Sequence, residues 1–196
     1  SWAPSIRYHD NKFWVFFCTP KEGLFMSNAV NPSGPWSPLH LVKKVEIFPL
    51  EVIVRNITTG SFCKRLGAKE GVVLAEPIFE ISYKNDEYGD PLINEDHAVA
   101  LGLCTRDEYN TIKSETLKIN ELLKAFFLRL NLKLVDFKVE FGKTKEGEIV
   151  LADEISPDSC RLWDVDTNKK YDKDVFRQDI GDLIETYKAV LARMEK

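Results

Sequence analysis

The sequence predicts an α+β fold in which an antiparallel sheet with flanking helices follows a short β meander. Residues 132–141 and 148–155 are predicted strands, the first with apolar and polar side chains alternating over 135–141, whereas residues 105–130 repeat apolar side chains at helical spacing. A third observation divides the chain, because residues 1–42 hold three of its four tryptophans and five of its nine prolines. We therefore expect two domains, 1–42 and 43–196.

Composition limits the classes of protein and partner. With 196 residues, 44% of them hydrophobic, the chain is long enough to bury a core. A net charge of -4 with dispersed cations argues against nucleic-acid binding, and no apolar run reaches the length of a membrane span. The four cysteines and three histidines lack zinc-ligand spacing, so neither structural zinc nor a disulfide scaffold is expected. We expect a cytoplasmic protein that binds small molecules and can form a homo-oligomer.

Residues 1–42 are expected to form a small antiparallel meander. Three short strands are predicted there, at residues 6–8, 13–17 and 24–26. Asp10 is interpreted as a turn residue between the first two strands. Residues 31–38 are rich in proline and glycine, so we expect a loop at that point.

From residue 43 onward, strands and helices are mixed. A strand over 45–55 should be interrupted by Pro49 or lie at a sheet edge, because proline has no N–H for the ladder. A long helix begins at Thr105, which forms a capping box with Glu108. The apolar stripe of this helix is expected to be core, and consists of Tyr109, Ile112, Ile119, Leu122, Phe126 and Leu130.

Two further elements complete the predicted fold. Residues 142–147 have the length and the glycines of a hairpin loop between the strands at 132–141 and 148–155. A last helix begins near Asp172 or Asp174 and runs toward Met194. Its buried side is expected to hold Phe176, Ile180, Leu183, Ile184, Tyr187 and Leu191.

Charged side chains alternate along the strand at 132–141. Asp136, Lys138 and Glu140 point to one side of an extended strand, and the apolar residues between them point to the other. Three more polar groups follow closely, namely Asp153, Asp158 and Arg161. This pattern favours a metal and phosphate site in which Glu140 and Asp153 are oxygen ligands for Mg²⁺. A solvated charged face has the same pattern and stays open as the alternative.

A second candidate site lies where the strand at 45–55 ends. Arg55 is followed by residues 58–61, a glycine-containing turn that can offer backbone N–H groups and the Ser61 hydroxyl to an anion. The Arg55 guanidinium adds a two-pronged donor for phosphate or carboxylate. The alternative is an ordinary loop with a surface ion pair, and the string matches neither a Walker A loop nor a dinucleotide fingerprint.

The loop from Lys84 to Asp90 is polar and precedes a helix that Asn94 caps. It carries one cation and three acids, a composition that most loops share. His97 on the following helix is expected to be packed or partly exposed, with no catalytic role.

Residues 43–196 resemble the C-terminal two thirds of bacterial SAICAR synthetases. Three strings carry the resemblance in the family's order, at residues 48–61, 134–142 and 152–161. The resemblance implies a ligase of de novo purine biosynthesis that uses ATP and Mg²⁺ to join L-aspartate to the carboxylate of the intermediate CAIR. An acyl phosphate is the implied intermediate.

The same resemblance implies roles for individual residues. CAIR is held by Arg55, Ser61 and Arg161. Mg²⁺ and the ATP phosphates are bound by Glu140 and Asp153.

The remaining matched positions also receive roles from the resemblance. Asp136, Lys138 and Glu140 are the expected cofactor-binding residues, and Lys138, Asp153 and Arg161 are the expected catalytic residues. Lys138 stabilises the transferring charge. Further substrate-binding positions are Lys84 and Asp90, near the aspartate, together with Asp158, Asp174 and Arg177.

Residues 1–42 instead resemble one blade of the five-bladed β-propeller glycosidases, in the strings at 2–10 and 31–36. They stand where SAICAR synthetases have a β-rich lobe over ATP. We therefore expect a hybrid chain, joined near residues 41–43, with weak or no ligase activity.

Two alternative functions stay open at this point. One is a carbohydrate-binding or glycosidase-derived module in which Trp2, Trp14 and Trp36 stack on sugars, although core packing is the simpler role for these rings. Glycoside hydrolysis itself is not expected, because the facing carboxylates that it needs lie in other blades of that fold. The other alternative is a non-catalytic fragment that retains affinity for nucleotide or CAIR.

Overall fold

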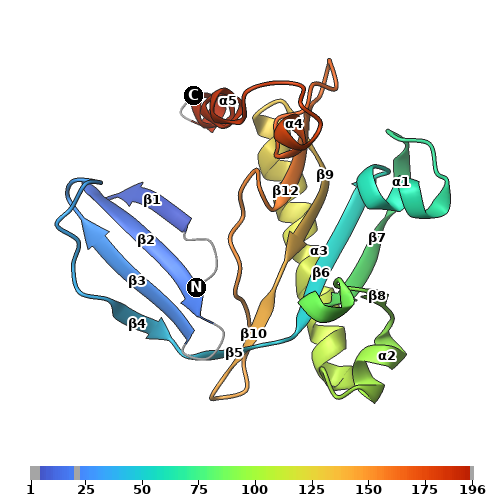
Figure 1. Cartoon of the computed structure of the whole chain (residues 1–196), viewed down its shortest axis with the longest axis horizontal. Helices are drawn as coiled ribbons and strands as arrows, with labels where there is room; N and C mark the ends of the chain where they lie inside the picture. Colours follow the sequence, from blue (N-terminus) through green and yellow to red (C-terminus); the bar gives the residue numbers. More distant parts are fainter. Residues whose placement is uncertain (1–4, 20–22, 195–196) are drawn as a thin grey trace. The chain divides into compact units, whose positions relative to one another are not determined.

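The computed structural model describes residues 5–19 and 23–194 of the chain. It divides into two compact units, one formed by residues 1–50 with 140–154 and the other by residues 51–139 with 155–196. We call them unit 1 and unit 2. The expected α+β class with antiparallel sheets and flanking helices is confirmed (Figure 1).

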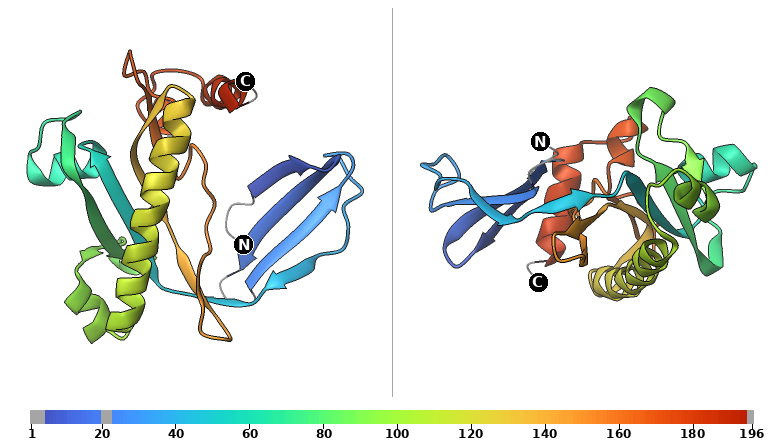
Figure 2. Two further views of the ribbon diagram at one scale, coloured as in Figure 1. Left: turned by 180° about the vertical axis from the view of Figure 1, so that it is seen from behind. Right: turned by 90° about the horizontal axis from the view of Figure 1, so that it is seen from below.

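The first sheet of unit 1 is an antiparallel meander of four strands (Figure 2). Its strands are β1 (Ser5–His9), β2 (Lys12–Thr19), β3 (Gly23–Ala29) and β4 (His40–Lys43). Asp10 and Asn11 form the tight turn between β1 and β2 with positive φ angles of 50° and 57°, a conformation that Asp and Asn tolerate. The three predicted strands are thus confirmed, and the structure adds β4.

The second sheet of unit 1 has the order β11–β10–β5 and is also antiparallel. It consists of β5 (Val45–Ile47), β10 (Phe141–Thr144) and β11 (Ile149–Leu151). Gly142 lets β5 approach closely, because a Cβ at this position would lie 3.0 Å from Val45 Cβ. The predicted loop at 142–147 is therefore partly wrong: its first residues are strand, and a turn closed by Gly147 N–H donating to Thr144 O follows (2.9 Å).

Unit 2 is built on a five-stranded sheet with the order β12–β9–β6–β7–β8. The strands are β6 (Leu50–Ile57), β7 (Val73–Tyr83), β8 (Leu92–Ile93), β9 (Leu132–Val139) and β12 (Cys160–Asp164). Pro49 separates β5 from β6, as its missing N–H predicts. The core lies along β6 and β9, where Val52, Val54 and Val135 are each at most 1% exposed.

Five α-helices of unit 2 accompany this sheet among the described residues. They are α1 (Gly60–Leu66), α2 (Glu95–Ala100), α3 (Arg106–Arg129), α4 (Asp174–Arg177) and α5 (Leu183–Met194), and a short 3₁₀ helix, η1, spans Asp86–Tyr88. The predicted capping box of Thr105 and Glu108 is confirmed at the start of α3. Figure 2 shows α3 lying across one face of the sheet.

The buried stripe of α3 differs from the expected one. Tyr109 and Ile112 are buried, but Leu122 is 71% exposed and Thr116 and Asn120 are fully buried. Asn120 can be buried because its side-chain amide exchanges hydrogen bonds with Asn56 of β6, at 2.8 and 3.1 Å. The helix thus faces the sheet along a row that includes polar residues, which apolar spacing alone does not reveal.

The predicted last helix is broken in two. Residues 178–182 separate α4 from α5. Phe176, Ile180, Ile184 and Leu191 are 54–71% exposed, so they do not form the buried side that their spacing predicts. Val190 is the residue of α5 that is buried instead.

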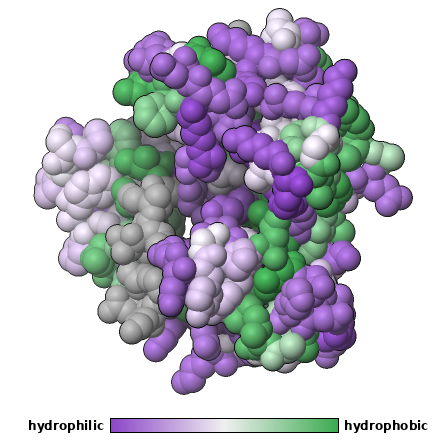
Figure 3. All heavy atoms as spheres, turned by 45° about the vertical axis from the view of Figure 1, so that its right-hand side comes forward, coloured by the Kyte–Doolittle hydropathy of each residue, from purple (hydrophilic) through white to green (hydrophobic). Residues whose placement is uncertain are grey.

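Apolar side chains also reach the surface elsewhere. Figure 3 shows hydrophobic residues among hydrophilic ones on one face of the molecule. Within the described residues, no helix is both long enough and apolar enough to span a bilayer.

Candidate functional site

Three adjacent strands of unit 2 place three charged side chains in one row. The register pairs Arg55 of β6 with Asp136 of β9, and Asp136 with Arg161 of β12. Arg55 Nη1 donates to Asp136 Oδ2 at 3.0 Å, while Arg161 Nη1 donates to both carboxylate oxygens at 2.8 and 3.1 Å. Arg55 is 3% exposed and Asp136 is 4% exposed. The surface ion pair that was the alternative for Arg55 is therefore wrong, since the pair is buried.

Two further carboxylates accept hydrogen bonds from the Nε atoms of the two arginines. Glu80 of β7 accepts a hydrogen bond from Arg55 Nε at 2.6 Å and also pairs with Arg65 of α1. Asp174 of α4 accepts one from Arg161 Nε at 2.7 Å. The guanidinium groups are thus fixed in orientation before any ligand arrives, which strengthens binding of a ligand of matching geometry.

The loop before α1 brings its backbone close to Arg161. Gly60 has a φ of +56°, and a Cβ at this residue would lie 2.9 Å from Arg161 Nη2. Glycine is required here by its conformation and by the close approach. The next residue, Ser61, accepts a hydrogen bond from Arg55 Nη2 at 3.3 Å, so the loop and both arginines form one cluster.

These groups line a pocket of about 170 Å³, which we call the cation-rich pocket. Its lining residues are Ile53, Arg55, Ser61, Asp136, Phe137, Lys138, Asp158, Ser159, Cys160, Arg161, Lys173 and Arg177. Five of them are cationic and two are acidic, which gives a formal excess of three positive charges. Such a pocket suits a phosphate or carboxylate ligand.

The electrostatics of the pocket follow from burial and crowding. Burial lowers the pKa of Lys173, and the neighbouring charges of Arg177, Lys138 and Arg161 lower it further, against the effect of Asp158. Burial also raises the pKa of Asp136, and the charges of Arg161 and Arg55 oppose that shift. A bound anion would relieve the repulsion among the cations.

Lys138 is held at the edge of this pocket by its neighbour Glu51. The Lys138 ammonium pairs with Glu51 Oε1, and Glu51 Oε2 accepts a hydrogen bond from Ser82 at 3.2 Å. Glu51 and Lys138 lie on the adjacent strands β6 and β9. The lysine side chain is 40% exposed, so it can still reach a ligand.

The two predicted metal ligands belong to unit 1. Glu140, which follows β9, is 5% exposed, and Asp153 follows β11. Burial raises the pKa of Asp153 to about 7, with further contributions from Glu154 and Glu140. Carboxylates crowded in this way are stabilised by a hard cation, so the donor set fits Mg²⁺.

The protein would supply few of the metal ligands itself. Among the described residues, no group of three or more His, Cys, Asp or Glu side chains is arranged to hold a metal ion. Two carboxylates are compatible with Mg²⁺, which commonly keeps waters and substrate phosphates in its shell.

The other predicted residues fall into two groups. Asp158 and Arg177 line the cation-rich pocket, and Asp174 supports it through Arg161. Lys84 and Asp90 are not among its lining residues; Asp90 accepts a hydrogen bond from Asn85 N–H at 2.8 Å and so closes its own loop.

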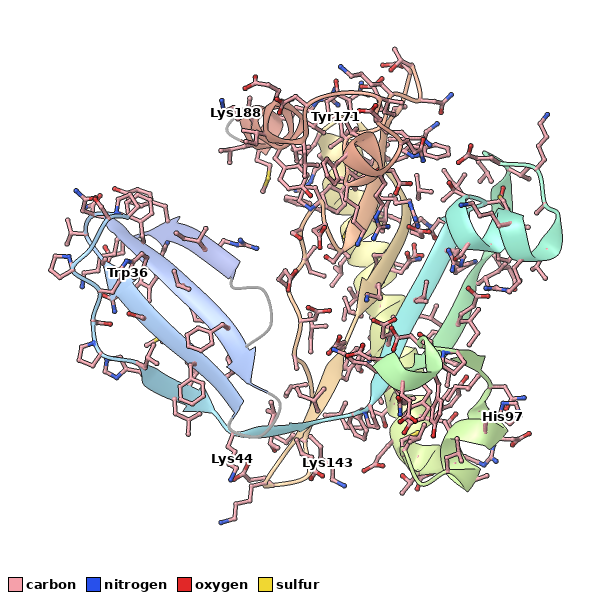
Figure 4. The ribbon with its side chains drawn as sticks, in the orientation of Figure 1. Trp36, Lys44, His97, Lys143, Tyr171 and Lys188 are labelled. Atoms are coloured by element: carbon pink, nitrogen blue, oxygen red, sulfur yellow. The ribbon has the colours of Figure 1, made fainter. Side chains whose placement is uncertain are left out.

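Histidine 97 has a structural role. Its Nδ1 accepts from the Asn94 N–H at 3.4 Å and completes the capping box of α2. Figure 4 shows His97 far from Tyr171, at the other end of unit 2. The expectation that it takes no part in chemistry stays a prediction.

Sequence reasoning missed several residues of this site. Lys173 lines the pocket, and Glu51 and Glu80 fix its cations. Glu51 stands one residue after the strand start and four before Arg55, so strand alternation puts both on one face. That periodicity was an available signal for Glu51, whereas Glu80 and Lys173 reach the cluster through the tertiary fold.

Comparisons with known proteins place the chain in a family. The sequence model of the SAICAR synthetase family matches residues 28–194, a segment that begins before residue 43. The phosphoribosylaminoimidazole-succinocarboxamide synthase of Finegoldia magna is 71% identical over 153 residues, which are 78% of this chain. The matched segment spans 66% of that relative's length.

Solved structures extend the similarity to the fold. A SAICAR synthetase in complex with ADP aligns with a TM-score of 0.77 and 38% identity over 96% of this chain and 97% of its own. The phosphoribosylaminoimidazole-succinocarboxamide synthase of Ehrlichia chaffeensis aligns with a TM-score of 0.79 and 33% identity over 98% and 95% of the two chains. The comparisons do not show the resemblance to β-propeller glycosidases. The matched family segment, the curated relatives and the shared fold together establish that the chain belongs to the SAICAR synthetase family.

Proposed function

We propose that this chain takes part in the ATP-dependent ligation of L-aspartate to CAIR, which yields SAICAR, ADP and phosphate. The observation that carries the proposal is the cation-rich pocket, in which Arg55 and Arg161 are oriented by buried carboxylates. A ribonucleotide such as CAIR carries a phosphate and a carboxylate, and both are ligands that arginine binds with two parallel hydrogen bonds.

The reaction divides into two displacements. A carboxylate oxygen of CAIR attacks the γ-phosphorus of ATP, ADP leaves, and an acyl phosphate forms. The aspartate amine then attacks the acyl carbon, phosphate leaves, and the nitrogen loses a proton to give the amide. Negative charge accumulates on the transferring groups in both steps, so fixed cations lower the barrier.

The residues of unit 2 provide binding and charge stabilisation. Arg55, Ser61 and Arg161 hold CAIR, and Asp136 keeps the two guanidinium groups in place. Lys138, at the pocket edge, is assigned to the transferring phosphoryl group. Asp158 and Arg177 complete the substrate pocket, and Asp174 acts on substrate through Arg161. Lys84 and Asp90 are assigned to binding of the substrate L-aspartate.

Glu140 and Asp153 of unit 1 are the residues that would hold Mg²⁺. When bound, the ion neutralises the charge of the ATP phosphates. The raised pKa of Asp153 means that this carboxyl gives up a proton when it binds a cation near neutral pH.

The proposal is tested by a coupled assay that follows ADP formation from CAIR, aspartate, ATP and Mg²⁺. Ser61→Ala and Glu140→Gln are expected to lower kcat/KM at least tenfold, while Lys118→Gln on the exposed face of α3 leaves it unchanged. ADP formation that needs no CAIR, or that is the same in all three variants, would refute the assignment.

Two expectations from the sequence stay predictions. One is that the 196-residue chain turns over weakly. The other is the non-catalytic alternative, in which thermal stabilisation by ADP or CAIR alone persists without turnover. Binding of xylan or arabinan oligosaccharides would instead support the carbohydrate-binding alternative. Trp14 already has a structural contact there, since its Nε1 donates to His9 O at 3.0 Å, and Trp2 lies outside the described residues.

A further inference from the structure

Lys173 is a cation of the cation-rich pocket to which the ligation proposed above gives no part. It immediately precedes α4, and its side chain is 23% exposed. Its ammonium lies 3.9 Å from Asp158 Oδ2, which is too long for a hydrogen bond. Within residues 5–19 and 23–194 this is the one ion pair of Lys173, and its side chain makes no hydrogen bond there. Asp158 is itself 62% exposed, so it is a weak counter-ion.

The backbone that carries Lys173 is fixed to β12. Asp172 is fully buried, and its carboxylate accepts hydrogen bonds from the N–H groups of Leu162 and Asp174, each at 2.8 Å. The N–H of Lys173 itself donates to Pro157 O at 3.2 Å. Figure 1 shows α4 close to β12. The base of the Lys173 side chain is therefore held in one place before a ligand binds, which lowers the entropy cost of binding.

The charges that act on the Lys173 ammonium all belong to the pocket. Burial lowers the pKa of this side chain, and the positive charges of Arg177, Lys138 and Arg161 lower it further. These three cations come from α4, β9 and β12, and each of them lines the pocket. Asp158, which raises the pKa, lines it as well. The ammonium therefore lies at the pocket, among like charges that an anion would neutralise.

The other cations of the pocket are better compensated. The two arginines that flank Asp136 share its carboxylate, and Lys138 pairs with Glu51. Arg177 is 55% exposed, so water screens its charge. Lys173 is thus the half-buried cation whose charge is least balanced. The pocket volume of about 170 Å³ is too small for a whole nucleotide but accommodates a single tetrahedral oxyanion.

We propose that Lys173 binds the phosphate group of the ribonucleotide substrate directly, together with the arginines of the same pocket. The identity of the substrate rests on the proposed ligation, whereas the contact with an anion follows from the pocket itself. A phosphate dianion has three outer oxygens, so it accepts hydrogen bonds from Arg55, Arg161 and Lys173 Nζ at the same time. The compact ammonium complements the planar guanidinium groups because it is a point charge without a fixed direction.

Sulfate is a suitable probe, because it has the charge and shape of a phosphate dianion and does not itself titrate above pH 7. Calorimetry of the full chain at pH 7, 8 and 9, each in two buffers of different ionisation enthalpy, measures the affinity and the protons taken up on binding. The bound anion raises the pKa of Lys173, so proton uptake should increase from pH 7 to pH 9. Sulfate should bind saturably, and acetate should bind about tenfold more weakly.

Two variants of Lys173 separate its charge from its titration. Lys173→Met removes the charge, so it should weaken sulfate binding about tenfold and abolish the proton uptake. Lys173→Arg keeps the charge, so its affinity should stay within about threefold of the unaltered chain. The uptake should nevertheless be absent in Lys173→Arg, because a guanidinium stays protonated at pH 9. Lys118→Met on the exposed face of α3 is the control and should change neither quantity.

Each opposite result overturns the proposal. Sulfate that binds folded Lys173→Met as tightly as the unaltered chain excludes the ammonium as a ligand group, with circular dichroism reporting the folding. Proton uptake that persists in Lys173→Arg belongs to another group, and this variant decides the question even where Lys173→Met does not fold. Acetate that binds as tightly as sulfate assigns the pocket to a carboxylate instead.

Failure of the ligation and failure of this inference are distinguishable. A chain that shows the expected sulfate responses but forms no ADP in the coupled assay contradicts the proposed function and leaves Lys173 as an anion ligand. A chain that forms ADP, and whose Lys173 variants bind sulfate unchanged, contradicts the role of Lys173 alone.

Discussion

The cation-rich pocket of unit 2 and the acid pair of unit 1, Glu140 and Asp153, differ in how their charges are balanced. In the pocket, Arg55 and Arg161 share the buried carboxylate of Asp136 and are held on their outer sides by Glu80 and Asp174. In unit 1, burial raises the pKa of Asp153 to about 7, and the neighbouring carboxyl groups of Glu154 and Glu140 raise it further. The pocket is therefore organised without its ligand, whereas the acid pair gains stability from a cation or a proton.

Replacing Arg161 by methionine should have the largest effect. The change removes hydrogen bonds to Asp136 and Asp174, carboxylates that are 5% and 4% exposed. Breaking one partner out of a buried ion-pair network should lower the free energy of unfolding by about 3 kcal/mol, measured by urea denaturation. Arg177→Met is the control, because this arginine is 55% exposed and should contribute less than about 1 kcal/mol. Equal losses in the two variants would show that the network does not organise the pocket.

Replacing Glu140 by glutamine should affect ligand binding at the acid pair but not at the cation-rich pocket. Removing this charge should weaken binding of Mg²⁺–ATP about tenfold or more, or about 1.4 kcal/mol, measured by calorimetry. Sulfate binding, which reports the cation-rich pocket, should stay the same. Glu146→Gln is the matched control, since Glu146 is an exposed acid of the same unit. A parallel loss of sulfate binding would contradict the independence of the two regions.

The acid pair should also differ from the pocket in its dependence on pH. With a pKa of about 7, the Asp153 carboxyl is mostly protonated at pH 6 and mostly ionised at pH 8. Affinity for Mg²⁺ alone should therefore rise about tenfold over this interval.

The stability contribution of Asp153 has the opposite dependence. Its folded pKa lies above the unfolded one, so protonation of this carboxyl favours the folded state at low pH. That contribution is lost as the pH rises through the interval between about 4 and 7. The Asp153→Asn variant should show neither dependence, and calorimetry with urea denaturation at each pH checks both. A variant that keeps the pH dependence would assign it to another group.

The smallest expected effect concerns Gly60. Alanine at residue 60 combines a strained positive φ with a Cβ that lies 2.9 Å from Arg161 Nη2. Gly67, at the other end of α1, has a φ of +65° but no heavy atom within 4 Å of the added Cβ. Both variants should lose about 1 kcal/mol of stability from backbone strain. Gly60→Ala alone should also weaken sulfate binding, by about threefold, because it displaces the guanidinium. Equal sulfate affinities would remove Gly60 from the pocket.

Local signals in the sequence were sufficient where one segment decides the outcome. The turn at Asp10, the break at Pro49 and the capping box of Thr105 are confirmed because each depends on residues within one turn of the chain. Arg55 was also found, from its place at the end of a strand before a glycine-containing turn, and Asp136 was found because strand alternation places it on one face with Lys138 and Glu140.

Predictions that depended on packing partners were less successful. Apolar spacing placed Leu122 in the core of α3 and missed Asn120, because the asparagine is buried by a partner on β6 that lies 64 residues away. The prediction of one last helix was wrong for a related reason. Its apolar residues have the helical period, but residues 178–182 interrupt the helix and Phe176 is exposed.

The sequence by itself determined the α+β class, the family strings and the types of charge that the candidate site contains. The tertiary structure decided which charges meet: the register of β6, β9 and β12 brings Arg55, Asp136 and Arg161 into one row, and α4 adds Asp174. It also placed Lys173 among the charges of the cation-rich pocket. The physical reason is that alternation fixes the face on which a side chain lies, whereas strand pairing fixes its neighbour, and pairing depends on residues distant in sequence.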